Sequence, residues 1–378
     1  MNLEYLYQTY FERPLTGRYI SPKKLQVVLD RYLEKGSCFA IGFSENGQPI
    51  YKIEIGNGPQ KVLAWSQMHG NESTTTKSLM DFINILQSLK GKDAVIDSFF
   101  DKYTLLAIPM LNPDGALAYT RENSNGIDLN RDAKQLTQQE SKLLRKVFEE
   151  FKPDLCLNLH DQRTLYGLPN DKPATISFLS PSADNKRSLT PSRVEAMKLI
   201  ATMNAFLQAY LPGQIGRYDD VFNENCVGDQ FQMAGVPTIL FEAGHYQGDY
   251  EREITRKYIL YAFMALFGIT NKSCFAYEEK DYFKVPENQK NFRDVILRNM
   301  HFKGKQLDIA LQYTEVLKED KIGWVAVIDR IGGCESLNGH REIDFGGNEV
   351  LINSNENVFV GEKVATILDK KLKKIIKI

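Results

Sequence analysis

A histidine and a glutamate three residues apart are the first side chains in this sequence that could do chemistry. His69 follows a run typical of a buried strand, residues 61–67, and Glu72 precedes a segment with helical character, residues 73–90. An imidazole and a carboxylate at this spacing can converge on one zinc ion, and a third protein ligand would leave the fourth position open for water, as in catalytic zinc sites. The same spacing also arises by chance among surface residues at a helix start. The pair therefore needs support from the rest of the chain.

That support comes from polar residues at the ends of further predicted strands. In an open α/β sheet, ligands bind in the crevice outside the carboxyl ends of the strands. A single histidine that closes a strand is usually an ordinary polar residue, but four such strand ends favour a metal site. The four ends carry His69, Asn112-Pro-Asp-Gly115, His160-Asp161 and Glu242.

His69, Glu72 and His160 together supply two nitrogens and one carboxylate, and we predict that they bind one zinc ion per chain. Glu242 would be a carboxylate near the metal without being a ligand. Such a group can take a proton from a zinc-bound water and pass it to a leaving amine. Taken alone, Glu242 could equally be a carboxylate at a turn.

The loop between residues 121 and 131 carries two arginines and an asparagine around a glycine turn. Guanidinium groups bind carboxylates through two parallel hydrogen bonds, so Arg121, Asn130 and Arg131 could clamp a substrate carboxylate. A spare arginine could stabilise a developing oxyanion. The alternative is a charged loop that is merely solvated.

Strand-like and helix-like segments alternate from residue 38 to residue 267, beginning with a hairpin marked by Asn46-Gly47. This alternation predicts an α/β fold whose largely parallel sheet is covered on both faces. Beyond residue 268 the pattern changes to one helical stretch, residues 288–298, and then short β-like runs broken by glycine. We predict a small β-rich second domain over residues 275–378, of unknown role.

Composition excludes some classes of partner and suggests a compartment. The chain has 378 residues, 25% of them charged, and a formal net charge of −1, which gives no electrostatic reason to expect nucleic acid or an anionic membrane as partner. The first residues lack the features of a secretory signal, and no apolar run reaches 18 residues. Five cysteines without a Cys-x-x-Cys pair are typical of free thiols in a reducing compartment. We therefore expect a cytoplasmic protein.

The ordered series of motifs resembles the zinc carboxypeptidase family. The series runs through residues 40–265 and comprises His69-x-x-Glu72, Asn112-Pro-Asp-Gly115, Arg121, Gly126-Ile-Asp-Leu-Asn-Arg131, His160 and Phe241-Glu242. The resemblance implies a three-layer α/β/α sandwich around a mixed, largely parallel sheet of about eight strands. The catalytic domain would occupy residues 1–270.

The resemblance also implies a role for each matching residue. His69, Glu72 and His160 would bind zinc, with Glu242 as general base and acid and Arg121 as the stabiliser of the oxyanion. Asn130 and Arg131 would hold the free C-terminal carboxylate of the substrate. Asp128 would hydrogen-bond to His69 and fix its tautomer, as metal-bound histidines require.

The expected function is hydrolysis of an amide bond adjacent to a free C-terminal carboxylate, in a small peptide. An alternative on the same scaffold is an aspartoacylase- or desuccinylase-like deacylase of N-acyl amino acids, which the β-rich C-terminal domain favours. A third hypothesis is a carboxypeptidase-like binding module that has lost activity. The intact set of predicted ligands, with Glu242 present, speaks against the third.

Some positions depart from the family pattern or leave the substrate open. The family has a mobile tyrosine about twenty residues before the catalytic glutamate, and Tyr218 matches that position only approximately. The polar stretch from Tyr218 to Asp229 predicts a polar or basic substrate side chain. Asp161 and His245 flank the predicted site without a counterpart. The sequence does not indicate the oligomeric state.

Overall fold

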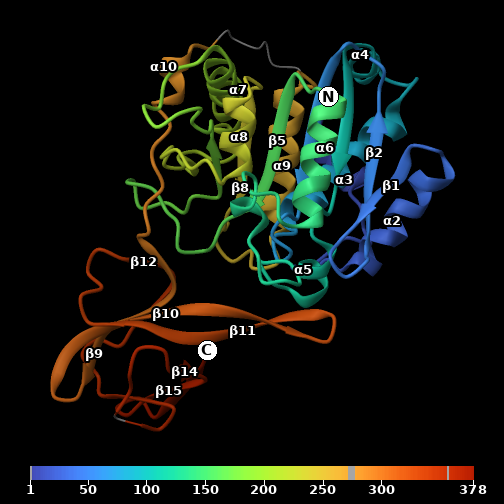
Figure 1. Ribbon diagram of the computed structural model, residues 1–378. Helices are drawn as coiled ribbons and strands as arrows, with labels where there is room; N and C mark the ends of the chain where they lie inside the picture. The colour runs from blue at the N-terminus through green and yellow to red at the C-terminus, as the bar shows by residue number, and fades with distance from the viewer. Residues whose placement is uncertain (1, 271–276, 356) are drawn as a thin grey trace. The chain divides into compact units, whose positions relative to one another are not determined.

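The chain forms two compact units in the computed structural model, which describes residues 2–270, 277–355 and 357–378. The first unit comprises Met1–Gln162 and Ala174–Asn288, and the second comprises Arg163–Pro173 and Gln289–Ile378 (Figure 1). A short segment from the middle of the chain thus belongs to the C-terminal unit. The domain junction expected between residues 270 and 275 lies outside the described residues.

The first unit is built on one eight-stranded mixed sheet with the order β1-β2-β4-β3-β5-β8-β6-β7. Its centre, β4-β3-β5-β8, consists of parallel neighbours, whereas the hairpin β1-β2 is antiparallel, as its Asn-Gly turn predicted. The strands are β1 (Cys38–Phe43), β2 (Pro49–Ile55), β3 (Gln60–Ser66), β4 (Tyr103–Ile108), β5 (Leu155–Asp161), β6 (Ile176–Leu179), β7 (Ile215–Arg217) and β8 (Thr238–Ala243).

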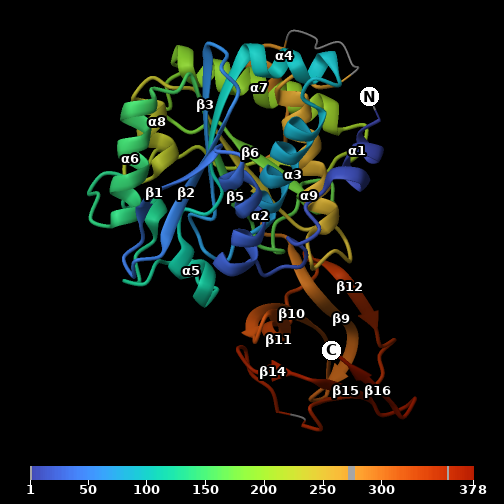
Figure 2. The same ribbon diagram turned by 90° about the vertical axis from the view of Figure 1, so that its right-hand side faces the viewer.

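Helices cover both faces of this sheet (Figure 2). The helical segments are α1 (Leu3–Tyr10), α2 (Pro22–Glu34), α3 (Thr74–Leu89), α4 (Ala94–Lys102), α5 (Pro113–Ala118), the 3-10 turn η1 (Leu129–Arg131), α6 (Gln139–Phe151), α7 (Pro191–Leu207), α8 (Val227–Met233), α9 (Glu253–Leu266) and α10 (Glu279–Tyr282). None of the helices within the described ranges combines the length and apolar character needed to cross a bilayer.

Alternating side chains of β3 show how the three layers form. Val62 and Ala64 pack in a core with residues of α1, α2, α3, α4, α7 and α9. Leu63 and Trp65 point to the other face and pack with residues of α6 and α8. A strand buried on both faces needs apolar residues at every position, which is why β3 has a continuous apolar run. The structure confirms the predicted three-layer α/β/α sandwich.

The second unit is β-rich, as predicted. One sheet has the order β12-β9-β10-β11-β14 and the other the order β13-β15-β16. The strands are β9 (Phe292–Phe302), β10 (Lys305–Lys318), β11 (Lys321–Ile331), β12 (Asn338–Asp344), β13 (Val350–Ile352), β14 (Lys363–Val364), β15 (Thr366–Asp369) and β16 (Lys374–Lys377).

The helix predicted over residues 288–298 is wrong, because most of that stretch belongs to β9. Val295 and Leu297 pack into the main apolar core of the second unit, whereas Ile296 packs on the opposite face with Ala310 and Leu337. Three consecutive buried residues hide the alternation that marks a strand. A short apolar run of this kind cannot be distinguished from a buried helix by its periodicity.

The segment Arg163–Pro173 is held by the start of β9 and by β12. Gly167 and Gln289 exchange two backbone hydrogen bonds of 2.8 Å, and the backbone N–H of Phe292 donates to Leu165 O at 3.2 Å. The ring Nε2 of His340 lies 2.7 Å from Thr164 O. These contacts make the insertion an integral part of the β-rich unit.

Candidate metal centre

The central strands of the first unit end at one edge of the sheet and bring the predicted site residues together. Because β4, β3, β5 and β8 are parallel neighbours, their carboxyl ends lie at the same edge (Figure 1). His69 follows β3, whereas His160 and Glu242 are themselves residues of β5 and β8. His160 and Glu242 are direct register partners across the two strands.

Side-chain hydrogen bonds hold the turn that carries His69. Gln67 has a left-handed backbone, with a φ of 45°, and its Nε2 donates to Gly70 O at 2.9 Å. Asn112 donates from Nδ2 to Met68 O at 3.2 Å while its Oδ1 accepts from Gly115 N at 2.8 Å. The Asn-Pro-Asp-Gly motif therefore holds the histidine turn and also begins α5.

Gly70 of this turn lies so close to the backbone of Gly115 that there is no room for a side chain. A Cβ atom added there would lie 1.9 Å from the carbonyl carbon of Gly115, which is backbone and cannot move aside cheaply. We expect Gly70→Ala to reduce the free energy of unfolding by about 1–3 kcal/mol, as overpacking of a tight site does. Urea unfolding of the metal-free protein measures the effect.

Gly323→Ala is the matched control for this substitution. Gly323 lies on β11, and its added Cβ would meet only the flexible side chain of Lys318, at 3.6 Å or more. The control should unfold close to the wild-type midpoint. A wild-type midpoint for Gly70→Ala would contradict the close packing of the two turns.

Three buried side chains form the centre of the site. Glu72 Oε1 lies 2.8 Å from His69 Nδ1, and Glu72 Oε2 lies 2.9 Å from His160 Nδ1. The two Nδ1 atoms are 3.1 Å apart. The three residues predicted as ligands thus converge on one point, and their candidate ligand atoms all lie within 4.8 Å of one another.

The donor set fits a metal cation. His69 Nε2 lies 3.0 Å from Asp128 Oδ1, and because an ionised carboxylate only accepts, this nitrogen carries the proton. Its Nδ1 faces Glu72 Oε1 and His160 Nδ1, as expected of a nitrogen that binds a metal ion. Two nitrogens each 2.0–2.1 Å from a tetrahedral zinc ion would be roughly 3.3 Å apart, close to the separation seen here.

The pKa values of Glu72 and His160 are shifted in the directions that favour metal binding at neutral pH. Burial opposes ionisation of Glu72, but His69 and His160 outweigh it and hold the pKa of the carboxyl well below its usual range. Burial lowers the pKa of His160 and so favours the neutral imidazole. Metal ligands must be deprotonated, and both residues already are. His69 differs, because Glu72 and Asp128 raise its pKa against the effect of burial.

Glu242 lies beside this cluster without joining it. Its Oε2 atom is buried and has no hydrogen-bond partner among the described residues. Burial, together with the nearby carboxylates of Glu72 and Asp161, raises the pKa of Glu242 well above its ordinary value. A carboxyl group with a raised pKa binds a proton more readily than an ordinary one, which suits a group that accepts a proton and then returns it.

Arg121 and Asp128 form a second layer around His69. Nε and Nη2 of Arg121 lie 3.1 Å and 3.0 Å from Asp128 Oδ2. Nη1 of the same arginine lies 3.1 Å from His69 Nδ1 and 3.3 Å from Glu72 Oε1. Asp128 also accepts from the backbone N–H of Asn130 at 2.8 Å. Arg121 therefore places a cation at the mouth of the site, and Asp128 orients both Arg121 and His69.

Asn130 and Arg131 lie further out, on η1. Asn130 Oδ1 accepts from Val227 N at 3.1 Å, which leaves its amide N–H group to donate to a ligand. Arg131 is exposed, and its Nη1 donates to Asn130 O at 2.9 Å and lies 3.2 Å from Cys226 Sγ. Within the described residues, neither side chain makes a recorded hydrogen bond to the histidine–glutamate cluster.

Two further residues, Asp161 and Arg18, lie next to this site, and the sequence indicated a role for neither of them. Asp161 follows His160, and its carboxylate accepts from Arg18 Nη1 at 2.6 Å. The position of Asp161 at a strand end was a usable signal, although it indicated no role. Arg18 gave no signal, because only the fold brings it next to β5.

Fold and site together define an α/β metalloprotein of the His–Glu–His type. Comparison with known families gives the same result. The zinc carboxypeptidase family model matches residues 23–220, so the chain belongs to the zinc carboxypeptidase family. The match includes His69, Glu72 and His160, whereas Glu242 lies beyond it. The family is zinc-dependent, in agreement with the ligand set.

Individual relatives are distant and match only in part. Carboxypeptidase SOL1 of Arabidopsis thaliana is 30% identical over 128 residues, which cover 31% of this chain and 26% of that protein. Carboxypeptidase M of Mus musculus is 28% identical over 194 residues, covering 44% of this chain and 42% of its own. The chain therefore spans about a quarter of the first relative and less than half of the second.

Solved structures confirm the fold. A metallo-carboxypeptidase from Burkholderia cenocepacia superimposes with a TM-score of 0.52 at 16% identity, over 66% of this chain and 70% of that one. Carboxypeptidase A from Helicoverpa armigera gives a TM-score of 0.52 at 13% identity, over 71% and 80% of the two chains. At these identities the similarity establishes the architecture alone.

Proposed function

We propose that this chain is a metallocarboxypeptidase-type hydrolase that binds one zinc ion and cleaves the amide bond next to a free C-terminal carboxylate. The observation that carries the proposal is the convergence of His69, Glu72 and His160 beside Glu242, whose Oε2 has no hydrogen-bond partner among the described residues. Membership in the zinc carboxypeptidase family supports the same reaction.

His69, Glu72 and His160 would hold the metal, which when bound supplies a water acidified towards neutral pH and polarises the scissile carbonyl. Beside these residues, Glu242 would accept a proton from the attacking water molecule as its oxygen bonds to the carbonyl carbon. The carboxyl group of Glu242 returns the proton to the amide nitrogen as the C–N bond breaks, which releases an amine and a carboxylate. Arg121 donates to the oxyanion that develops on the carbonyl oxygen.

Substrate recognition would rest on Asn130 and Arg131. The exposed guanidinium of Arg131 and the amide N–H of Asn130 suit a substrate carboxylate. Nearby, Asp229 is buried in the first turn of α8, and burial raises its pKa to about 7 although a backbone N–H and Arg131 oppose the shift. An acidic group there supports the proposal of a polar or basic substrate side chain.

A substrate panel tests the proposal against its main alternative. We expect dipeptides with a free C-terminus to be hydrolysed, and the same dipeptides with a C-terminal amide to lose about 10–100-fold in kcat/KM. That loss corresponds to the roughly 1.5–3 kcal/mol of a charge-assisted hydrogen bond.

Acetyl- and succinyl-amino acids form the second arm of the panel. The β-rich second unit is the feature that favours a deacylase, and turnover of acyl amino acids without turnover of dipeptides would establish that function instead. Zinc binding without turnover of either class would establish a binding module.

We also propose a cytoplasmic location. The four cysteines within the described residues, Cys38, Cys156, Cys226 and Cys334, are free thiols, as is usual in a reducing compartment. The fifth, Cys274, lies outside the described residues. Fractionation of the native host cell would test the location.

A further inference from the structure

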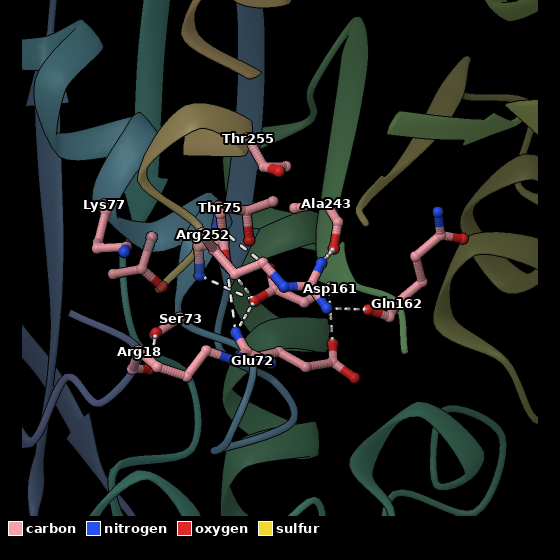
Figure 3. Close-up of polar contacts among 12 residues, drawn as sticks. Arg18, Glu72, Ser73, Thr75, Lys77, Asp161, Gln162, Ala243, Arg252 and Thr255 are labelled. Atoms are coloured by element: carbon pink, nitrogen blue, oxygen red, sulfur yellow. Dashed lines mark hydrogen bonds and ion pairs between the residues drawn. The ribbon is translucent and has the colours of Figure 1, made fainter. Parts of the chain in front are cut away.

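Asp161 is a buried carboxylate that the proposed reaction does not use. It follows His160 on β5, and successive strand residues point to opposite faces, so its side chain points away from that of the ligand. The carboxylate accepts from Arg18 Nη1 at 2.6 Å and Thr75 N at 3.3 Å (Figure 3). It also accepts from Thr74 Oγ1 at 2.6 Å and Thr74 N at 3.0 Å. Such a complete set of donors indicates a fixed position.

Asp161 caps a helix that belongs to another part of the chain. The N-cap residue of α3, Ser73, makes no capping hydrogen bond with its own side chain. The first backbone N–H groups of α3 instead donate to Asp161, and an anion at a helix N-terminus is favoured by the helix dipole. The carboxylate thus fastens the start of α3 to β5.

Glu72 lies just before this helix and is tied to the same residue. The backbone N–H of Asp161 donates to Glu72 Oε2 at 3.1 Å, the oxygen that also lies 2.9 Å from His160 Nδ1. Asp161 therefore contacts Glu72, a proposed metal ligand, through its backbone N–H. Its side chain holds the start of α3, the helix that follows Glu72. Both contacts fix the position of Glu72 relative to His160.

Arg18 completes the arrangement from the N-terminal segment. Its guanidinium neutralises Asp161, and both side chains are buried, with exposed fractions of 6% and 0%. The backbone of Arg18 is itself anchored, because its N–H donates to Glu251 Oε2 at 2.7 Å and its carbonyl accepts from Ser73 Oγ at 2.7 Å. Removing one partner of a buried ion pair is strongly destabilising, so Arg18 is needed to hold Asp161 in place.

We propose that Arg18 and Asp161 are positioning residues of the metal site, which set its affinity by holding Glu72 against His160. The inference rests on the proposed zinc site and extends it to a pair outside the ligands and the general base. The pair acts through hydrogen bonds to the start of α3 and to the side chain of Glu72, and it touches neither the metal nor the substrate.

Zinc affinity, measured by competition with a chromophoric chelator, tests this inference without recourse to enzyme activity. We expect Asp161→Asn and Arg18→Met each to bind zinc about 10–100-fold more weakly than the wild type, the usual loss when a residue that orients a ligand is removed. Arg18→Lys retains the positive charge and should recover part of the affinity.

Asp249→Asn is the matched control. Asp249 is also buried and caps a helix, α9, by accepting from the backbone N–H groups of Glu253, Ile254 and Thr255 at 2.8–3.1 Å. Its carboxylate makes no recorded hydrogen bond to the site among the described residues, so this variant should lower the unfolding midpoint while its zinc affinity stays at the wild-type value.

The outcomes separate the inference from the function on which it rests. Wild-type zinc affinity in Asp161→Asn and Arg18→Met, or a loss no greater than that of Asp249→Asn, would overturn the positioning role. A wild-type protein that binds no zinc would overturn the proposed metal site itself. If Asp161→Asn does not fold, the comparison of Arg18→Met with Arg18→Lys decides.

Discussion

Glu242→Gln should lower kcat for dipeptide hydrolysis by about 10²–10⁴-fold while zinc content stays near that of the wild type. The range is the usual contribution of a general base and acid. Glutamine fills the same space but can neither accept the proton from water nor return it to the amine. Because Glu242 is not one of the clustered ligands, its replacement should leave the metal in place. Steady-state kinetics and elemental analysis of the same preparation measure both quantities.

Glu150→Gln is the matched control, since Glu150 is an exposed glutamate on α6. It should retain full activity. Unfolding of Glu242→Gln should occur at or above the wild-type midpoint, because a neutral amide replaces a carboxyl whose ionisation is opposed by burial. Turnover of Glu242→Gln near the wild-type rate would show that the proton is carried by another group.

His160→Ala should weaken zinc binding by on the order of 10²–10³-fold and abolish hydrolysis at trace zinc concentrations. Protein sites with four ligands bind zinc with about 10–16 kcal/mol, so each ligand contributes roughly 2.5–4 kcal/mol, or about two to three powers of ten in affinity. The substitution leaves Glu72 and His69 as a pair, which is too few ligands to hold the ion through dialysis. Elemental analysis after dialysis gives the result directly.

His301→Ala controls for the loss of an imidazole elsewhere in the chain. His301 is exposed on β9 of the second unit, and its removal should leave zinc content unchanged. Chelator treatment of the wild type should abolish activity, and added zinc should restore it. Full zinc content in dialysed His160→Ala would remove His160 from the ligand set.

The sequence indicated that His69, Glu72 and His160 would lie close together, because polar residues at the ends of apolar strands are conspicuous. His160 lies next to the last residue of β5, which is apolar before it except at Asn158, and Glu242 follows three apolar residues of β8. Parallel neighbouring strands then bring these ends together without further information. Strand order and the turn after β3 bring His69, Glu72 and His160 to the same edge of the sheet.

Other parts of the structure could not be predicted, because they depend on long-range contacts. Asp294 is fully buried on β9, and its carboxylate accepts hydrogen bonds from Gln312 and Tyr313 of β10 and from Thr164, 130 residues away in the insertion. When the partner of a charged residue in an apolar run is unknown, the pattern favours a helix with one polar face. Arg18 was missed for the same reason, since its partner Asp161 lies 143 residues along the chain.

Because the insertion Arg163–Pro173 belongs to the β-rich unit, neither unit is a single continuous stretch of the chain. The polypeptide passes from one unit to the other three times, after Gln162, after Pro173 and after Asn288. Trimming the C-terminus at residue 288 would therefore leave the insertion, which begins three positions beyond His160, without its partners Gln289 and His340. A catalytic core expressed alone needs a splice from Gln162 to Ala174, which the 2.5 Å hydrogen bond from Gln162 Nε2 to Ala174 O already holds close together. Exchanging the β-rich unit for that of a homologue would likewise require replacing two separate stretches of the gene, one for each segment of the unit.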